Sequence, residues 1–275
     1  MRTALRLAGF VVASCLLTPA TATAARSDEP QNGEQASPQA QASAQQTGPA
    51  SSPRRADFLF GRPKGSIGVR GNWLFASAGS DLFDFVTRHL TLEKEHFNSA
   101  GFGADVAFTV TPRAQIEASI ERNQMARGSE YRDFVDNDLR PIEQRTSMQT
   151  THVGVALRYA LTPRGEAVSR LAWIPRRVVP FVGAGAGAMF YQFQQTGDFV
   201  DFVDFSVFPE SFRSQGWAPT GHVFGGVDLQ LYKGLYGTVQ GRYTKAAGKL
   251  ASDFIDFDPI DLSGFRLSAG INLLF

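Results

Sequence analysis

Eight charged side chains lie at positions that alternate with apolar or small residues, which would place them on one face of predicted strands. Four of the eight are carboxylates and four are guanidinium groups, so the opposite charges on that face are equal in number. An unpaired charge in an enclosed setting is very costly, and we therefore expect these groups to form ion pairs. The eight residues are Arg70, Asp105, Glu117, Glu121, Arg158, Asp228, Arg242 and Arg266.

Histidines on the same face raise the question of catalysis. His152 and His222, with Glu117 or Asp228, could form a hydrolase-like set, but such a set also requires a placed nucleophile. No serine motif adjoins either histidine, and no His/Cys/Asp cluster has the spacing of a metal site. We expect no enzyme activity, no metal and no cofactor. The same face carries Gln115, Gln230 and Gln240.

A hydrophobic period of two predicts the strands that hold these residues. It is clearest near the carboxy-terminus, where Phe265, Leu267, Ala269, Ile271, Leu273 and Phe275 alternate with small or polar positions in the segment 262–275. Each predicted strand is near the roughly 9–11 residues that cross a bilayer at a tilt. The other segments are 66–75, 101–110, 114–122, 150–161, 179–190, 217–231 and 235–244.

The sequence therefore predicts an all-β fold, a transmembrane eight-stranded antiparallel up-and-down β-barrel. A soluble sandwich would need an inner face of Leu, Ile and Val. Here the apolar face is rich in Ala, Gly and Phe, and the other face carries charges in mid-strand. The net charge of +1 gives no reason to expect nucleic acid as a partner.

The amino-terminal part divides into two further segments. Residues 1–25 have the pattern of a signal peptide, with Arg2 and Arg6 before an apolar stretch and an A-x-A cleavage motif at 22–24. A rival interpretation is a lipoprotein box acylated on Cys15. Residues 26–60 are rich in Ala, Gln, Ser and Pro, which predicts a disordered periplasmic linker. The barrel would then span 61–275.

The connections between predicted strands alternate in length. Tight turns are expected at 111–113 and 232–234, and long, extracellular loops at 76–99, 123–149, 191–216 and 245–261. The connection 162–178 is long yet falls on the short-turn side. Its Trp173 could anchor at the membrane interface, but we favour an ordinary basic loop.

The long loops share a repeated Asp/Phe pattern at 81–86, 198–205 and 253–258. One interpretation is that strands continue beyond the membrane and the aromatic side chains pack the loops together. The sharper hypothesis is an exposed adhesive patch of Phe199, Phe202 and Phe205. Neighbouring aspartates would keep this patch soluble or bind Ca²⁺. We favour packing.

The run V-P-F-V-G-A-G-A-G at 179–187, the strand count, the loop alternation and the terminal Phe275 together resemble the small OmpA/OmpX-like outer-membrane barrels. The resemblance covers about 60–275, and it does not extend to the peptidoglycan-binding domain that follows the barrel in the larger members of the group. It implies bacterial outer-membrane lipid and lipopolysaccharide as surroundings. It also implies that the barrel-assembly machinery reads a terminal signal, here Phe265, Leu273 and Phe275.

The expected role is structural, or surface interaction with an extracellular partner through the long loops. A barrel of eight strands is only wide enough for its own side chains to fill. A narrow gated channel through rearranging ion pairs is the runner-up. An outer-membrane lipid-modifying enzyme comes third.

Overall fold

The computed structural model describes residues 59–136, 138–169 and 172–275. The predicted signal peptide and nearly all of the predicted linker lie outside the described residues. The described chain begins with a short strand, β1 (Leu59–Phe60), in the last two positions assigned to the linker. Within the described ranges no helix is long and apolar enough to cross a membrane.

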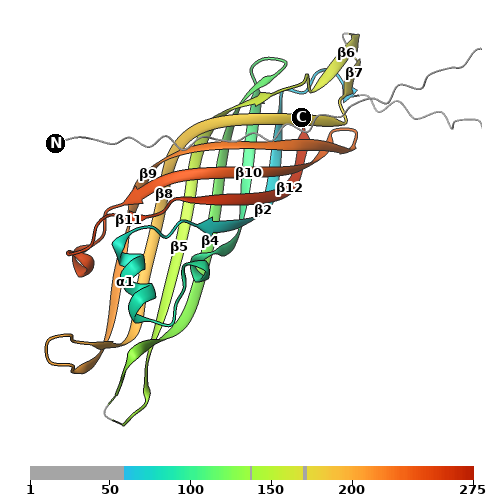
Figure 1. The fold of residues 1–275 in the computed structure, drawn as a ribbon. Coiled ribbons are helices and arrows are strands. Elements are labelled where there is room, and N and C mark those ends of the chain that lie inside the picture. Colours follow the sequence, from blue (N-terminus) through green and yellow to red (C-terminus); the bar gives the residue numbers. More distant parts are fainter. Residues whose placement is uncertain (1–58, 137, 170–171) are drawn as a thin grey trace, which may run out of the picture. The chain divides into compact units, whose positions relative to one another are not determined.

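Eight strands form a closed ring in which every neighbour is antiparallel (Figure 1). The ring closes where the last strand pairs with the first, with Leu273 opposite Ile67. All eight segments predicted as strands are strands, so the predicted fold class is confirmed. In ring order they are β2 (Gly65–Ala76), β3 (Ser99–Thr109), β4 (Ala114–Val135), β5 (Pro141–Ala160), β8 (Val178–Val200), β9 (Val207–Tyr232), β10 (Leu235–Gly248) and β12 (Gly264–Leu274).

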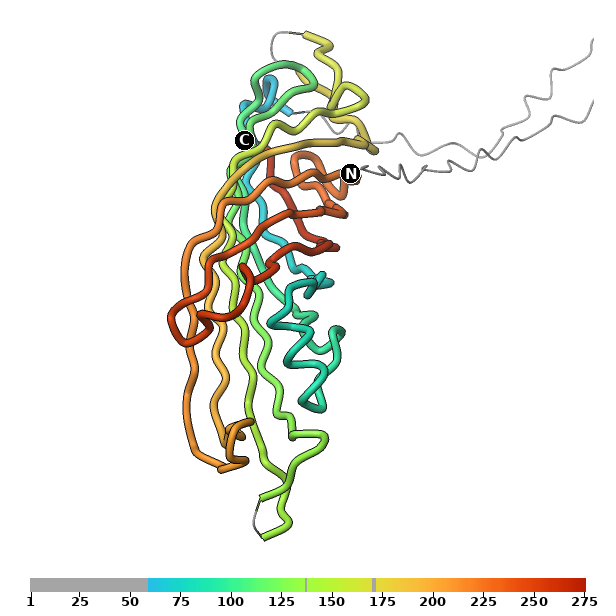
Figure 2. Tube along the Cα trace, turned by 60° about the vertical axis from the view of Figure 1, so that its left-hand side comes forward, coloured from blue at the N-terminus to red at the C-terminus, as the bar shows by residue number. Residues whose placement is uncertain are grey.

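Four of these strands are much longer than a bilayer requires. β4, β5, β8 and β9 have 22, 20, 23 and 26 residues, and their two hairpins run on well past the other strands (Figures 1 and 2). The predicted loops 123–149 and 191–216 are therefore mostly strand. Only 136–140 and 201–206 remain as connections. The sequence-based boundaries were wrong here because the pattern changes phase, as described below.

The first long loop contains a helix, α1 (Asp81–His89), and a 3₁₀ turn, η1 (Lys94–Phe97). Asp81 and Asp84 lie in the first turn of α1 and Arg88 and His89 in the last, which suits the helix dipole. Leu82, Phe83 and Val86 share the buried face. The fourth long loop contains η2 (Ser252–Phe254) and β11 (Ile260–Asp261).

The connection on the short-turn side is a β-hairpin rather than an irregular loop. β6 (Gly165–Ser169) pairs with β7 (Ala172–Pro175), and β7 also pairs with β1. Trp173 is buried in this small sheet, at 5% exposure, and so does not anchor at the membrane interface. The favoured expectation of an ordinary basic loop was wrong, because β1 supplies the partner that orders it.

The wall of the ring has apolar side chains outside and polar side chains inside, the reverse of a soluble protein. Large apolar side chains such as Val69, Phe102, Ile116, Val155 and Leu267 are 47–69% exposed. Alternate positions point inward and are polar and buried, for example Asp105, Gln115 and Asn272. An apolar outside around a polar inside is the arrangement that a lipid bilayer requires of a barrel.

Candidate functional site

The structure brings all eight predicted charged residues together inside the barrel. They come from seven of the eight strands, and each is buried or nearly so. A ninth residue, Arg164, joins them from the connection between β5 and β6. We call these nine residues the charged core: Arg70, Asp105, Glu117, Glu121, Arg158, Arg164, Asp228, Arg242 and Arg266.

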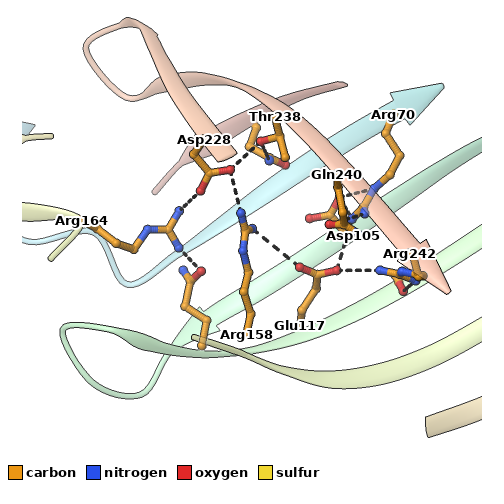
Figure 3. Close-up of polar contacts among 12 residues, drawn as sticks. Arg70, Asp105, Glu117, Arg158, Arg164, Asp228, Thr238, Gln240 and Arg242 are labelled. Atoms are coloured by element: carbon orange, nitrogen blue, oxygen red, sulfur yellow. Dashed lines mark hydrogen bonds and ion pairs between the residues drawn. The ribbon is translucent and has the colours of Figure 1, made fainter. Parts of the chain in front are cut away.

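Glu117 lies at the centre of the charged core (Figure 3). Its carboxylate oxygens are 3.2 Å from Arg242, 3.3 Å from Arg70 and 3.7 Å from Arg158. Arg70 also contacts Asp105 at 2.5 Å and donates to the Gln240 amide oxygen at 3.3 Å. One carboxylate thus links guanidinium groups from three different strands.

Asp228 organises the end of the charged core nearest the short turns. Its carboxylate accepts from Arg158 at 2.6 Å, Arg164 at 3.2 Å and the Thr238 hydroxyl at 2.7 Å. Arg164 also donates to Gln115. Burial, with the neighbouring Arg158, lowers the pKa of Arg164 to about 10, so it remains charged at neutral pH.

Arg164 is the member that sequence reasoning missed. Its segment, T-P-R-G, follows the end of a predicted strand and was assigned to a basic loop. Five guanidinium groups therefore face four carboxylates in the described lumen. The available signal was an arginine only three residues past the end of a predicted strand.

Glu121 organises the opposite end of the charged core. It contacts Arg266 at 3.2 Å, Arg242 at 3.5 Å and Arg70 at 3.9 Å. The predicted histidines lie nearby, with ring centroids 5.2 Å apart. His152 shares a 3.0 Å hydrogen bond with Thr220, and neither ring is hydrogen-bonded to a carboxylate in the described chain. The structure places the pair without the oriented base of a catalytic triad.

Aromatic rings complete the lumen on the side of β8. The Arg158 guanidinium lies 3.6 Å from the centroid of Phe181, and that of Arg242 lies 5.1 Å from Phe224. Gly183 of β8 makes room for the Phe224 ring, since a Cβ on Gly183 would lie 2.3 Å from it. A cavity beside Arg70, Asp105 and Arg158 holds only about 10 Å³. That is room for about one water molecule, so the lumen is packed rather than open at this level.

Beyond the charged core, toward the long loops, lies a second core that is apolar. Phe83 of α1 packs edge-to-face against Phe97 of η1, at 4.7 Å between centroids, and against Phe193 of β8, at 6.3 Å. We call this cluster the apolar cap. Its buried members are Ala78, Leu82, Phe83, Val86, Leu90, Leu92, Phe97, Met125, Tyr131, Ile142, Met148, Met189, Tyr191, Phe193, Val200, Ala218, Ala246, Phe254, Ile260 and Leu262.

The three phenylalanines predicted as an exposed patch do not share one environment. Phe199 is buried at 8% exposure and packs on Phe212, with centroids 4.6 Å apart. Phe202 and Phe205 are 45% and 64% exposed, and both contact Phe134. The prediction was wrong for Phe199, because β8 continues through it and turns its ring inward. The favoured interpretation, packing between loops, holds for part of the set.

The aspartates beside these phenylalanines accept backbone hydrogen bonds. Val203 N–H donates to Asp201 at 2.7 Å, and Ser206 N–H donates to Asp204 at 2.9 Å. The bond from Ser206 lowers the pKa of Asp204. Within the described ranges no group of three or more His, Cys, Asp or Glu residues could hold a metal ion.

The residues predicted as an assembly signal all lie on the outer face of the barrel. Phe265, Leu273 and Phe275 are 45–54% exposed. Phe265 contacts Phe75, and Phe275 contacts Phe108, with centroids 6.3 Å and 6.4 Å apart. Lys64 N–H donates to the Phe275 carbonyl at 2.7 Å, which ties the end of the chain to the start of β2.

The closed antiparallel ring, the apolar exterior and the packed polar lumen define the class: an eight-stranded outer-membrane-type β-barrel. No family model and no curated protein matches the chain.

Solved structures of small outer-membrane barrels do resemble it. Neisserial surface protein A is 12% identical, with a TM-score of 0.43, over 80% of this chain and 97% of that one. OprG from Pseudomonas aeruginosa is 11% identical, with a TM-score of 0.44, over 79% and 99%. The attachment invasion locus protein Ail of Yersinia pestis is 12% identical, with a TM-score of 0.39, over 77% and 100%. At this identity the likeness concerns the fold and carries no information on function.

Proposed function

We propose that this chain is exported to the bacterial outer membrane, where it presents a rigid extracellular surface for contact with another macromolecule. The observation that carries the proposal is the apolar cap. It packs α1 with residues of both long hairpins in one buried apolar cluster, in which Phe83 of α1 contacts Phe193 of β8. A surface held in this way has little conformational entropy to lose on binding, which favours a specific contact.

The contact surface that we propose lies at the tips of the two long hairpins. It contains five exposed apolar residues and is called the tip patch: Val135, Leu139, Phe202, Val203 and Phe205, at 45–91% exposure. Phe134 joins the hairpins, with its ring centroid 5.9 Å from that of Phe202 and 6.0 Å from that of Phe205. Exposed apolar residues gathered in this way are typical of binding sites.

Phe205 gives the tip patch a further feature. Its backbone lies in the left-handed region, with φ of 60°. That conformation is unfavourable for a bulky residue, persists only where surrounding contacts hold it, and is enriched at binding sites. The carboxylates of Asp201 and Asp204 lie in the same turn, so a partner with an apolar surface rimmed by basic groups would fit.

The channel alternative gains no support from the lumen. A solute would have to pass both the charged core and the apolar cap, and the cavity beside Arg70 has a volume of about 10 Å³. The enzyme alternative lacks a placed nucleophile and base, since neither histidine is bonded to a carboxylate in the described chain. Surface contact is therefore the function that we propose.

The test compares bacteria that display the wild-type chain with bacteria that display the triple variant Phe202→Ser, Val203→Ser, Phe205→Asn. We expect the variant to lose most retention on cell-coated and protein-coated glass in a flow chamber. The control is Ile255→Ser, because Ile255 is 81% exposed on a different loop. Gel migration of unboiled samples checks that each barrel is folded. Equal retention of all three strains would contradict the proposal.

A further inference from the structure

The outer wall of the barrel has a groove of about 650 Å³. It crosses the lipid-facing surface of β2, β3, β4 and β12. Gly71 has no side chain and Ala104 has only a methyl group, so two outward positions are nearly empty, while Phe102 and Ile120 stand beside them. This volume lies within the range of small-molecule binding sites and is large enough for one acyl chain.

Arg122 and Thr151 line the same groove. Arg122 is the next outward-facing residue after Ile120, and it is exposed. Its guanidinium donates to the amide oxygen of Gln149 at 2.8 Å. Within the described ranges it makes no ion pair. Its charge is therefore available to an anion outside the protein.

Arg122 lies where the outward face of β4 changes from the apolar Ile116, Ala118 and Ile120 to polar residues, as expected at a membrane interface. In the register of the sheet Arg122 faces Thr151, Thr151 faces Phe190, and Phe190 faces Trp217. The rings of Phe190 and Trp217 are in contact, with centroids 5.4 Å apart. Aromatic residues gather at the interface, and arginine extends its charge to the headgroup level there.

Polar groups continue above Arg122 on the side of the long loops. The outward positions of β4 and β5 between this level and the hairpin tips hold no carboxylate until Glu130 and Glu143. Six of them carry guanidinium, amide or hydroxyl groups, which can bind phosphate and sugar, and the other two are Ala126 and Gly128. The six are Arg122, Gln124, Arg145, Ser147, Gln149 and Thr151.

We infer that the groove binds one molecule of a phosphorylated glycolipid of the outer leaflet, of the lipid A type. An acyl chain occupies the groove over Gly71, and a phosphate group pairs with Arg122. The neighbouring amides and hydroxyls bind the sugar. The inference rests on the proposed outer-membrane orientation, because that orientation places the long-loop end among glycolipid headgroups. It does not depend on the tip patch.

Two substitutions remove the two halves of the site. Arg122→Gln removes the charge. Gly71→Leu fills the groove, and a Cβ at Gly71 would meet no atom of the described chain within 4 Å.

The chain offers a matched control for each. Arg213 is also exposed and hydrogen-bonded to glutamines, Gln192 and Gln215, but lies on β9 away from the groove. Gly221 is an exposed glycine of β9 with equally open space around its Cβ position.

The experiment titrates purified, folded protein in detergent micelles with lipid A and counts bound molecules by native mass spectrometry. We expect one tightly bound lipid A for the wild-type protein. Arg122→Gln should weaken it by about tenfold, as expected for the loss of a charge-assisted contact. Gly71→Leu should weaken it to a similar extent, while Arg213→Gln and Gly221→Leu stay within about twofold of wild type.

Two results would overturn the inference. Equal affinities for all five proteins would show that the groove is not a binding site. Phosphatidylglycerol that binds as tightly as lipid A, and depends on Arg122 and Gly71 in the same way, would show that the occupant is not a glycolipid. The triple tip-patch variant should keep wild-type affinity for lipid A, so a failure of the surface-contact proposal leaves this inference standing, and the reverse also holds.

Discussion

The charged core and the apolar cap are built from the same strands with opposite chemistry. On β4, the outward residue Ile120 is apolar and its inward neighbour Glu121 is charged. A few residues further, the outward Arg122 and Gln124 are polar and the inward Met125 is apolar. Apolar and polar residues still alternate along the unbroken strand, but the apolar residues move from the outward face to the inward face.

The same change occurs on β8. Outward positions in the membrane part are Ala184, Ala186 and Ala188, and beyond them the outward residues are Gln192 and Gln194. The inward residues there become Met189, Tyr191 and Phe193, which are fully buried. The medium outside the wall explains the difference. Lipid favours an apolar exterior, and water favours a polar one, so the interior takes the opposite character in each region.

The two cores also contribute differently to stability. The attraction within an enclosed ion pair roughly offsets the free energy lost when both charges leave water. The charged core therefore fills the lumen without stabilising the barrel strongly. The apolar cap gains about 25 cal/mol for each Å² of apolar surface that it buries. Loss of one partner should therefore be severe in the charged core, and loss of volume should be severe but local in the apolar cap.

The largest effect is expected from Glu117→Gln. This change leaves Arg70, Arg158 and Arg242 without their shared carboxylate and should lower the free energy of unfolding of the barrel by about 3–5 kcal/mol. Urea titration in micelles, followed by gel migration of unboiled samples, measures it. Glu166→Gln, at an exposed position of β6, is the control and should change little. Equal midpoints for the two variants would show that the charged core is not a coupled network.

A smaller and local effect is expected from Phe83→Ala. Phe83 is 1% exposed in the apolar cap, and its truncation should cost about 3 kcal/mol. Because β2 and β3 remain paired below it, we expect α1 to open while the barrel stays closed. Limited proteolysis between residues 77 and 98 should accelerate, with unchanged gel migration of the barrel. Global unfolding would show instead that the apolar cap and the barrel form one cooperative unit.

Replacement of residues 81–89 by a glycine–serine linker tests whether the charged core blocks the lumen when the apolar cap is broken. The apolar cap would be broken, but the charged core would still fill the barrel. We expect no steady ionic current in planar-bilayer recordings, for either this variant or the wild-type protein. Discrete current steps after the replacement would mean that the apolar cap alone closes a conducting lumen, and would revive the channel alternative.

The smallest effect is a pH dependence confined to the apolar cap. Burial raises the pKa of Tyr131 above its ordinary value of 10.0. The folded state therefore holds the proton more tightly, so the stability is complete below about pH 10 and is lost as pH rises through the folded pKa. The loss should not exceed about 1.4 kcal/mol per pH unit. Hydrogen exchange at α1 should accelerate above that pH in the wild-type protein and less in Tyr131→Phe. Identical profiles would exclude this tyrosine as the cause.

The sequence by itself determined the membrane part of this protein. Period-two alternation gave all eight strands, and the balance of four carboxylates and four arginines predicted a paired lumen. Both follow from local constraints, because a strand in lipid must show one apolar face and an enclosed charge must have a partner. Even there, Arg164 was missed, since its role depends on a connection that folds back to the barrel mouth.

Only the tertiary structure decided the part beyond the membrane. The hairpins of β4–β5 and β8–β9 were assigned to loops because the apolar residues change face within each strand, which interrupts a pattern based on one face. The position of Phe199 against Phe212, and the packing of Phe83 between η1 and β8, depend on contacts between segments far apart in the chain. Alternation shows that a residue lies on a strand face, but the surroundings of that face exist only once the strands have assembled.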